Sequence, residues 1–238
     1  MTAVRKIVIL TGAGISAESG VPTFRGPDGL WEGHRVEDVA TPQAFRRDPV
    51  LVQRFYDARR AALARVAPNR AHLALARLDR EWTGGLLIVT QNVDDLHDRA
   101  AVIPDNDRPP RLVHMHGELK SALCDRCGAT RRWTGDLTGA APCGCGGTLR
   151  PDIVWFGEMP YHMDRIDAAI ADCALFVSIG TSGAVYPAAG FVDAARHAGA
   201  RTLELNLDPS AGTQLFDEAR HGPAGRLVPA WVGEILTG

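Results

Sequence analysis

The stretch Ile7-Val8-Ile9-Leu10-Thr11-Gly12-Ala13-Gly14-Ile15-Ser16-Ala17-Glu18-Ser19-Gly20 decides the fold. Its apolar part, from Lys6 to Leu10, has the length and composition of a strand that is buried in a parallel sheet. Glycines directly after such a strand let the backbone approach a pyrophosphate, and the start of a following helix favours its charge. Because Ala17 replaces the third glycine of the G-x-G-x-x-G pattern, this stretch alone is also compatible with a turn that has no function.

Further apolar runs occur at Leu86–Thr90, Ala174–Ile179 and Thr202–Leu205, and each is followed by polar or small residues. Helical patterns lie between several of them, for example from Ala188 to His197, before Gly199. This alternation predicts an α/β fold with a doubly wound, Rossmann-like parallel sheet. Ligands of such sheets bind outside the carboxyl ends of the strands.

Composition limits the classes of function. The 238 residues are 45% hydrophobic and 23% charged, which suits one large α/β domain with a small insertion. A net charge of -2 does not favour nucleic acid or membrane partners. Arg5 and Lys6 precede an apolar run that is too short for a secretory signal, and no run is long enough to span a membrane. We therefore expect a soluble cytoplasmic protein.

Four of the five cysteines form the pattern Cys124-x2-Cys127 and Cys143-x-Cys145. In a cytosolic chain, such spacing favours one tetrahedral zinc with a closed shell of four thiolates, and hence a structural role. The second pair is one residue shorter than C-x2-C, and the surrounding glycines can supply the backbone freedom for a tighter loop. An empty or disulfide-bonded cluster is the alternative.

Two segments interrupt the alternation of strands and helices. Val50 to Arg80 is helical and is divided near Pro68-Asn69, whereas Leu119 to Leu149 is rich in Gly and Cys. We interpret them as a smaller zinc-binding and helical lobe. The expected division is a large lobe of about 1–35, 81–118 and 150–238, and a small lobe of about 36–80 (helical) and 119–149 (zinc module).

Several ordered motifs resemble those of sirtuins. The loop from Gly12 continues as Val21-Pro22-Thr23-Phe24-Arg25-Gly26 and is similar to the sirtuin cofactor loop. Gln91-Asn92-Val93-Asp94-x-Leu96-His97 and His114-Met115-His116-Gly117 resemble two further motifs, and the similarity extends from near Lys6 to near Gly222. The resemblance implies a class III, NAD-dependent protein-lysine deacylase that removes acetyl, succinyl and possibly malonyl groups and releases nicotinamide and O-acyl-ADP-ribose. It implies contacts to NAD from Gly12, Ala13, Gly14, Ile15, Ser16, Phe24, Arg25, Trp31, Gln91, Asn92, Val93, Asp94, Gly180, Thr181, Ser182, Asn206, Leu207, Asp208 and Ala224.

The resemblance also assigns catalytic roles. Asn92 and Asp94 would hold the ribose and amide of nicotinamide, although either residue could instead be an ordinary helix N-cap. His116 would be the general base that deprotonates a ribose hydroxyl, because the family places its base directly before the glycine. From chemistry alone His114 is an equal candidate, and a core or capping histidine is the common alternative.

Two sets of residues are candidates for substrate binding. Tyr56 and Arg59 lie three residues apart, on one face of the predicted helix, and resemble the pair that marks sirtuins acting on acyl groups with a terminal carboxylate. The resemblance also implies that Val154, Trp155, Phe156 and Gly157 pair with the substrate backbone as an added strand. A solvated helix face and an ordinary strand are the respective alternatives.

Three other functions compete with deacylation. An NAD-dependent dehydrogenase needs an acidic residue about 20 residues beyond the glycines. Glu32, Glu37 and Asp38 lie nearby, but none clearly ends a second strand, and release of nicotinamide rather than formation of NADH would distinguish the two functions. A zinc-ribbon binding module is disfavoured by the near-neutral charge and the dominant α/β region. An NAD-dependent protein ADP-ribosyltransferase remains an alternative, which transfer of label from NAD to protein would reveal.

Overall fold

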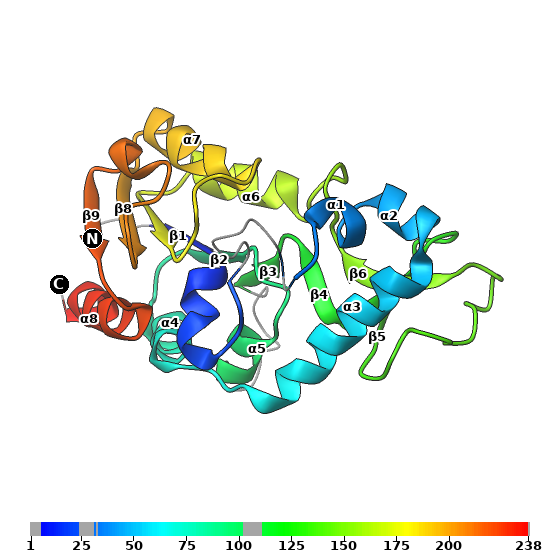
Figure 1. Ribbon diagram of the computed structural model, residues 1–238. Coiled ribbons are helices and arrows are strands. Elements are labelled where there is room, and N and C mark those ends of the chain that lie inside the picture. The colour runs from blue at the N-terminus through cyan, green and yellow to red at the C-terminus, as the bar shows by residue number, and fades with distance from the viewer. Residues whose placement is uncertain (1–5, 24–30, 32, 102–110, 238) are drawn as a thin grey trace.

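Six parallel strands form the main sheet of the computed structural model, in the order β3-β2-β1-β7-β8-β9 (Figure 1). The structure describes residues 6–23, 31, 33–101 and 111–237. The strands are β1 (Ile7–Thr11), β2 (Leu86–Thr90), β3 (Leu112–His114), β7 (Leu175–Ile179), β8 (Arg201–Asn206) and β9 (Glu218–His221). The four apolar runs of the sequence are thus the four central strands. The direction of strand progression reverses between β1 and β7, as in doubly wound sheets.

Helices cover both faces of this sheet, which explains why its central strands are apolar at nearly every position. α6 (Met163–Ala171) and α7 (Phe191–His197) pack on one face, where Val8, Leu10 and Phe176 lie. α4 (Arg70–Glu81) and α8 (Ala224–Thr237) pack on the other face (Figure 1). The smaller helical elements of this part are η1 (Ala13–Ser19), α5 (Leu96–Ala100), η3 (Ala188–Gly190) and η4 (Thr213–Leu215).

A second, antiparallel sheet of order β5-β4-β6 lies beside the first (Figure 1). It consists of β4 (Gly117–Cys124), β5 (Thr130–Arg132) and β6 (Leu149–Ile153). The helices α1 (Val36–Val39), α2 (Pro42–Arg47) and α3 (Pro49–Ala62) pack against it in a separate apolar cluster. The sequence pattern did not predict β4, because an irregularity between Glu118 and Ala122 breaks the alternation of inward and outward residues.

The helical segment of residues 50–80 divides where the sequence predicted. α3 ends at Ala62, η2 (Leu63–Arg65) follows, and Asn69 caps α4 by accepting hydrogen bonds from the amides of Ala71 and His72. The expected small lobe extends to residue 80 and so would include α4. In the structure, however, α4 packs against α8 and the main sheet. The reason is its apolar face, which places residues such as Leu75 and Leu78 against the strands.

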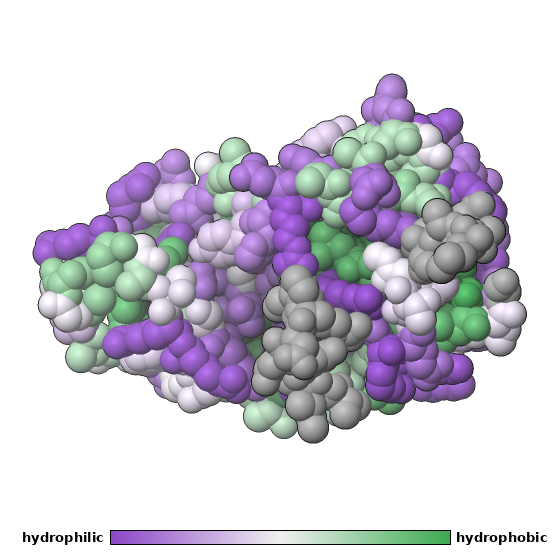
Figure 2. Space-filling model, turned by 180° about the vertical axis from the view of Figure 1, so that it is seen from behind, coloured by the Kyte–Doolittle hydropathy of each residue, from purple (hydrophilic) through white to green (hydrophobic). Residues whose placement is uncertain are grey.

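Hydrophilic residues dominate much of the reverse side of the molecule, with apolar residues gathered in smaller patches between them (Figure 2). Among the described residues, no helix is long and apolar enough to cross a membrane.

Candidate active site

A cavity of about 760 Å³ opens at the carboxyl ends of the parallel strands. The loops that follow β1, β2, β7 and β8 form one side of it, and α3 and the end of β6 form the other. The cavity therefore includes the point where the strand order reverses, between β1 and β7. This is where doubly wound sheets bind their ligands.

The loops after β1 and β7 touch each other at glycines. A Cβ atom on Gly12 would lie 2.8 Å from the Gly180 carbonyl oxygen, and one on Gly14 would lie 2.7 Å from the Gly180 Cα. The Gly14 amide donates a hydrogen bond to the Gly180 carbonyl (2.8 Å). A side chain at Gly12 or Gly14 would therefore collide with the backbone of the loop after β7. The helix that follows is a 3-10 helix, η1.

Most of the residues predicted to contact NAD lie in the cavity wall: Gly12, Ala13, Gly14, Trp31, Gln91, Asn92, Val93, Asp94, Gly180, Thr181, Ser182, Asn206, Leu207, Asp208 and Ala224. Ile15 and Ser16 do not line it, because η1 turns both side chains into the protein, where they are fully buried. Phe24 and Arg25 lie outside the described residues.

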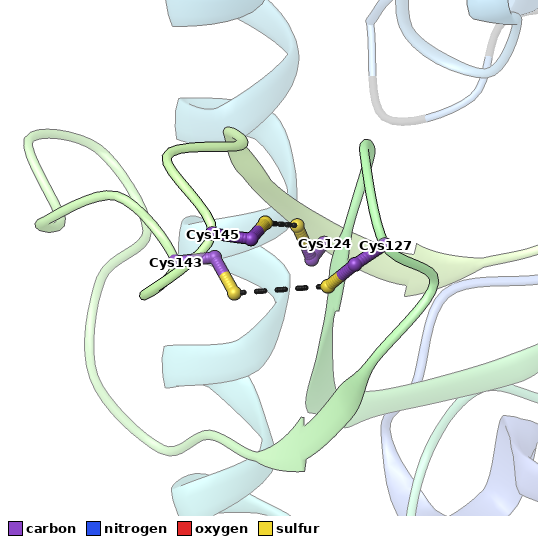
Figure 3. Close-up of side chains that lie close together, drawn as sticks. All are labelled: Cys124, Cys127, Cys143 and Cys145. Carbon is purple, nitrogen blue, oxygen red and sulfur yellow. Dashed lines mark hydrogen bonds between the residues drawn. The ribbon is translucent and has the colours of Figure 1, made fainter.

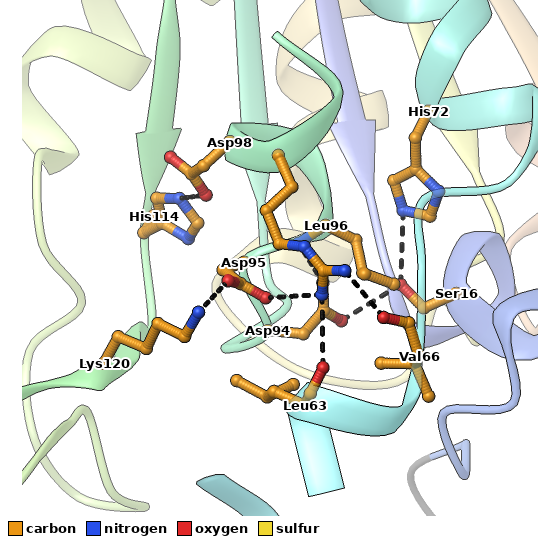
Figure 4. Close-up of polar contacts among 11 residues, drawn as sticks. Ser16, Leu63, Val66, His72, Asp94, Asp95, Leu96, Asp98, His114 and Lys120 are labelled. Atoms are coloured by element: carbon orange, nitrogen blue, oxygen red, sulfur yellow. Dashed lines mark hydrogen bonds and ion pairs between the residues drawn. The ribbon is translucent and has the colours of Figure 1, made fainter. Parts of the chain in front are cut away.

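Ser16 is nevertheless the centre of a polar network beneath the cavity floor (Figure 4). Its hydroxyl donates to Asp94 Oδ2 (3.0 Å) and accepts from Asn92 Nδ2 (3.1 Å). The other Asp94 oxygen accepts from the Leu96 amide (3.0 Å). The N-cap of α5 is Asp95, so neither Asn92 nor Asp94 is the N-cap considered from the sequence. Burial raises the pKa of Asp94. The network fixes both side chains at the end of β2.

His72 completes this network from behind. The Asn69 amide donates to His72 Nδ1 (3.3 Å), so the proton of the neutral ring is on Nε2, which lies 3.4 Å from the Ser16 hydroxyl. Burial lowers the pKa of His72 to about 4. The ring is therefore neutral near pH 7 and can hold Ser16 without adding charge beneath the cavity.

The two candidate bases have different surroundings. His116 lines the cavity, and its Nδ1 lies 3.2 Å from the Gln91 carbonyl oxygen. Because a carbonyl only accepts, Nδ1 carries the proton and Nε2 keeps its lone pair. His114 is not part of the cavity wall, and its Nε2 pairs with Asp98 Oδ2 at 3.1 Å (Figure 4). Geometry thus favours His116 over His114.

The far wall of the cavity is aromatic. Tyr56 and Arg59 both belong to α3 and both line the cavity. The Arg59 guanidinium carbon lies 4.3 Å from the centroid of the Trp31 ring, and the Trp155 indole nitrogen donates to the Tyr56 hydroxyl oxygen (3.1 Å). Burial raises the pKa of Tyr56 above its ordinary value, so its hydroxyl is neutral near pH 7.

The segment after β6 forms the rim of the same cavity. Val154, Trp155, Phe156 and Gly157 all line it, but β6 itself ends at Ile153. The Val154 amide donates to the His116 carbonyl (3.0 Å). β6 pairs with β4 on one side only and is the edge strand of its sheet.

Comparison with known proteins agrees with this geometry. The sequence profile described as Sir2 family matches residues 12–187. The chain belongs to the Sir2 family. It is 53% identical over 236 residues to an NAD-dependent protein deacylase of Yersinia pseudotuberculosis serotype I, covering 97% of this chain and 82% of that protein. It is 52% identical over 238 residues to an NAD-dependent protein deacylase of Escherichia coli K12, covering 98% of this chain and 83% of that protein. A solved Sir2 homolog–NAD complex superimposes with a TM-score of 0.86 at 37% identity, covering 98% of this chain and 90% of that one.

The sequence analysis missed several residues that line the cavity of this Sir2 protein. Glu18 lies at the end of η1, and its carboxylate accepts from the Gly225 amide (2.8 Å) at the start of α8. Tyr186 is strongly exposed, and Ser210 and Ala211 belong to the loop after β8. The turn-forming residues Pro209, Ser210 and Gly212 were the signal that could have identified this loop.

The four cysteines of this Sir2 protein come together from two hairpin-like segments (Figure 3). Their sulfur atoms all lie within 4.8 Å of one another, with 3.4 Å between Cys124 and Cys145 and 3.9 Å between Cys127 and Cys143. These separations exclude disulfide bonds, which join sulfurs at about 2.05 Å. Tetrahedral zinc with Zn–S bonds of about 2.3 Å places its sulfurs roughly 3.8 Å apart. The four thiols therefore fit one structural zinc.

Proposed function

We propose that this chain is an NAD-dependent protein-lysine deacylase whose general base is His116. The single observation that supports this assignment most strongly is the Nδ1 contact of His116 with the Gln91 carbonyl, which leaves Nε2 available at a cavity of about 760 Å³. Deacylase activity is further supported by Sir2 family membership and by relatives at 52–53% identity that carry this activity in their names.

Residues of the loops after β1, β2, β7 and β8 would hold the dinucleotide. The close contact of Gly12 and Gly14 with Gly180 brings the loops after β1 and β7 together in the cavity wall. The buried Gln91 Nε2 has no hydrogen-bond partner among the described residues, which suits a site whose ligand supplies an acceptor. When bound, NAD supplies the ADP-ribose that accepts the acyl group. Asn92 and Asp94 would orient its nicotinamide end.

As the general base, His116 would take the proton of a ribose hydroxyl at its Nε2. Burial lowers its pKa, although the Gln91 contact opposes this, so the ring is neutral near pH 7 and can act as a base. The buried His72–Ser16–Asp94 network keeps the neighbouring side chains in place.

We further propose that the acyl end of the substrate reaches Tyr56 and Arg59, and that a terminal carboxylate is recognised there. A guanidinium and a neutral phenol are both donors to a carboxylate. Both residues line the cavity. A succinyl group carries a carboxylate that can accept from this pair, whereas an acetyl group has no carboxylate. The substrate backbone would lie along the segment Val154–Gly157, which follows the edge strand β6.

The competing functions find less support. Glu37 and Asp38 belong to α1, do not line the cavity, and so do not suit the ribose contact of a dehydrogenase. An ADP-ribosyltransferase is distinguished by transfer of label from NAD to a protein. We also propose that the enzyme acts in the cytoplasm, where four thiols stay reduced and available for zinc.

A panel of matched peptides tests this function and its acyl range. Wild type should release nicotinamide in the presence of acetyl-lysine and succinyl-lysine peptides and NAD. Arg59→Met should lower kcat/KM for the succinyl peptide roughly ten- to a hundred-fold more than for the acetyl peptide, because a charge-assisted hydrogen bond of about 1.5–3 kcal/mol is lost. Arg54→Met, on the same helix and outside the cavity wall, is the matched control. Equal losses on both peptides in Arg59→Met would show that the pair does not read the carboxylate.

A further inference from the structure

Among the described residues, the Tyr56 hydroxyl has one hydrogen-bond partner, and its own hydrogen has no acceptor. Its oxygen receives the hydrogen bond of the Trp155 indole N–H (3.1 Å). An indole nitrogen can only donate, so the phenol must be the acceptor in this bond. Its own hydrogen then points elsewhere, and no acceptor for it exists among the residues that the structure describes. Since Tyr56 lines the cavity, a ligand can supply that acceptor.

Trp155 is itself held in one orientation. Its backbone amide donates to Glu158 Oε2 (2.9 Å), and the Arg150 guanidinium carbon lies 4.1 Å from the centroid of its ring. The Phe45 ring packs on it with centroids 5.3 Å apart, and the residue is only 2% exposed. The indole N–H therefore has little freedom to turn away from Tyr56.

We propose that Trp155 is a specificity-determining positioning residue: its indole N–H occupies the acceptor side of the Tyr56 hydroxyl and so directs the phenol hydrogen to the carboxylate of a dicarboxylic acyl group. This inference rests on the proposed carboxylate recognition by Tyr56 and Arg59. It predicts that Trp155 influences acyl choice through Tyr56, 99 positions away along the chain, as well as lining the cavity.

The test is a double-mutant cycle on the full-length protein, with kcat/KM measured for matched acetyl and succinyl peptides. Trp155→Phe keeps an aromatic ring but removes the N–H, and should lower the ratio of succinyl to acetyl kcat/KM roughly ten-fold. In a Tyr56→Phe background, the same change should leave the ratio where Tyr56→Phe alone puts it. Trp82→Phe is the matched control, because it also removes an indole hydrogen bond (to the Gly85 carbonyl, 3.2 Å) but lies outside the cavity wall.

Two results would overturn the proposal. The first is an equal loss of kcat/KM on both peptides in Trp155→Phe. The second is a further fall in the succinyl to acetyl ratio when Trp155→Phe is added to Tyr56→Phe. If Trp155→Phe fails to fold, 3-benzothienylalanine at position 155 replaces it, since this residue keeps the bicyclic shape and has no N–H. It should give the same change in ratio.

The cycle also separates this inference from the function on which it rests. If wild type does not act on the succinyl peptide, or if Arg59→Met changes both activities equally, the carboxylate site is wrong. If wild type is active and Arg59→Met is selective while Trp155→Phe is not, the site stands and only the role of Trp155 is wrong.

Discussion

His116 and His114 are two residues apart, but the fold places their rings in different environments. His116 lines the cavity, and its Nε2 has no hydrogen-bond partner in the part of the chain that the structure describes. For His114, burial lowers the pKa, but the hydrogen bond and charge of Asp98 outweigh this and raise the pKa overall. Both ring nitrogens of His114 face acceptors, the Asn92 carbonyl and Asp98 Oδ2, so the ring offers no lone pair to the cavity. Two chemically identical side chains are thus placed in different surroundings by their neighbours.

We expect His116→Ala to lower kcat/KM for deacylation by about 10²–10⁴-fold while NAD binding and thermal stability stay near those of wild type, because a general base is lost. In wild type, kcat/KM should rise with pH through a pKa below the ordinary histidine value of about 6.5, since the active form is neutral. His114→Ala should have a much smaller effect. Near-normal turnover of His116→Ala would contradict the assignment of His116 as the general base.

At the scale of elements, η1, α4 and β2 meet in the polar network around Ser16. His72 joins the three: its Nδ1 accepts from the Asn69 amide at the start of α4, and its Nε2 contacts Ser16 in η1. Protonation at Nδ1 would break the contact with the Asn69 amide and place a charge in a fully buried position. The neutral ring therefore contributes to stability as well as to the site.

The free energy of unfolding should consequently depend on pH through His72. Its pKa is lowered from 6.5 to about 4 in the folded protein, so the stabilisation is fully present above pH 6.5 and is lost as the pH falls towards 4. At about 1.4 kcal/mol per pKa unit, this one group accounts for up to roughly 3 kcal/mol.

Urea unfolding of His72→Gln and wild type between pH 7 and 4.5 measures this effect. The variant should lose less stability over this range than wild type does. His197→Gln, at an exposed histidine, should behave like wild type. Parallel pH curves for wild type and His72→Gln would contradict the assignment.

At the scale of the whole molecule, α3 connects the cysteine cluster to the cavity. Asp57 accepts from the Leu137 amide (2.8 Å) and the Thr138 amide (2.9 Å), in the loop that leads to Cys143. Arg60 pairs with Asp57 at 2.7 Å in a buried position. These two residues alternate along α3 with Tyr56 and Arg59. One helix therefore contacts the cysteine-rich segment on one side and forms the Tyr56 and Arg59 part of the cavity wall on the other.

Loss of zinc should accordingly affect both stability and activity. Cys127→Ser is expected to bind less than one equivalent of zinc, to lower the Tm by roughly 5 °C or more, and to lower deacylation of both peptides, because the anchoring loop is released. Metal analysis, calorimetry and nicotinamide release measure the three quantities. Cys173→Ala, outside the cluster, should retain one equivalent. A zinc-free Cys127→Ser protein with normal Tm and turnover would refute the structural role.

Much of this protein follows from local sequence alone. β1, β2, β7 and β8 were predicted as continuous apolar runs, because strands covered by helices on both faces need apolar side chains at nearly every position. The loops after these strands were predicted as the site, because the carboxyl ends of parallel strands share one edge. The spacing of the four cysteines likewise indicated zinc, since ligands on short loops need few residues between them.

Tertiary structure decided the surroundings of the individual side chains, because these depend on contacts between residues that are distant in the sequence. The choice of His116 over His114 depends on the Gln91 carbonyl and on Asp98. The burial of Ile15 and Ser16 depends on how η1 packs, and α4 joins the main sheet because its apolar face finds α8 there. The bond between Trp155 and Tyr56 joins residues 99 positions apart. Local patterns determine which elements form, but only the packed molecule determines which side chains meet.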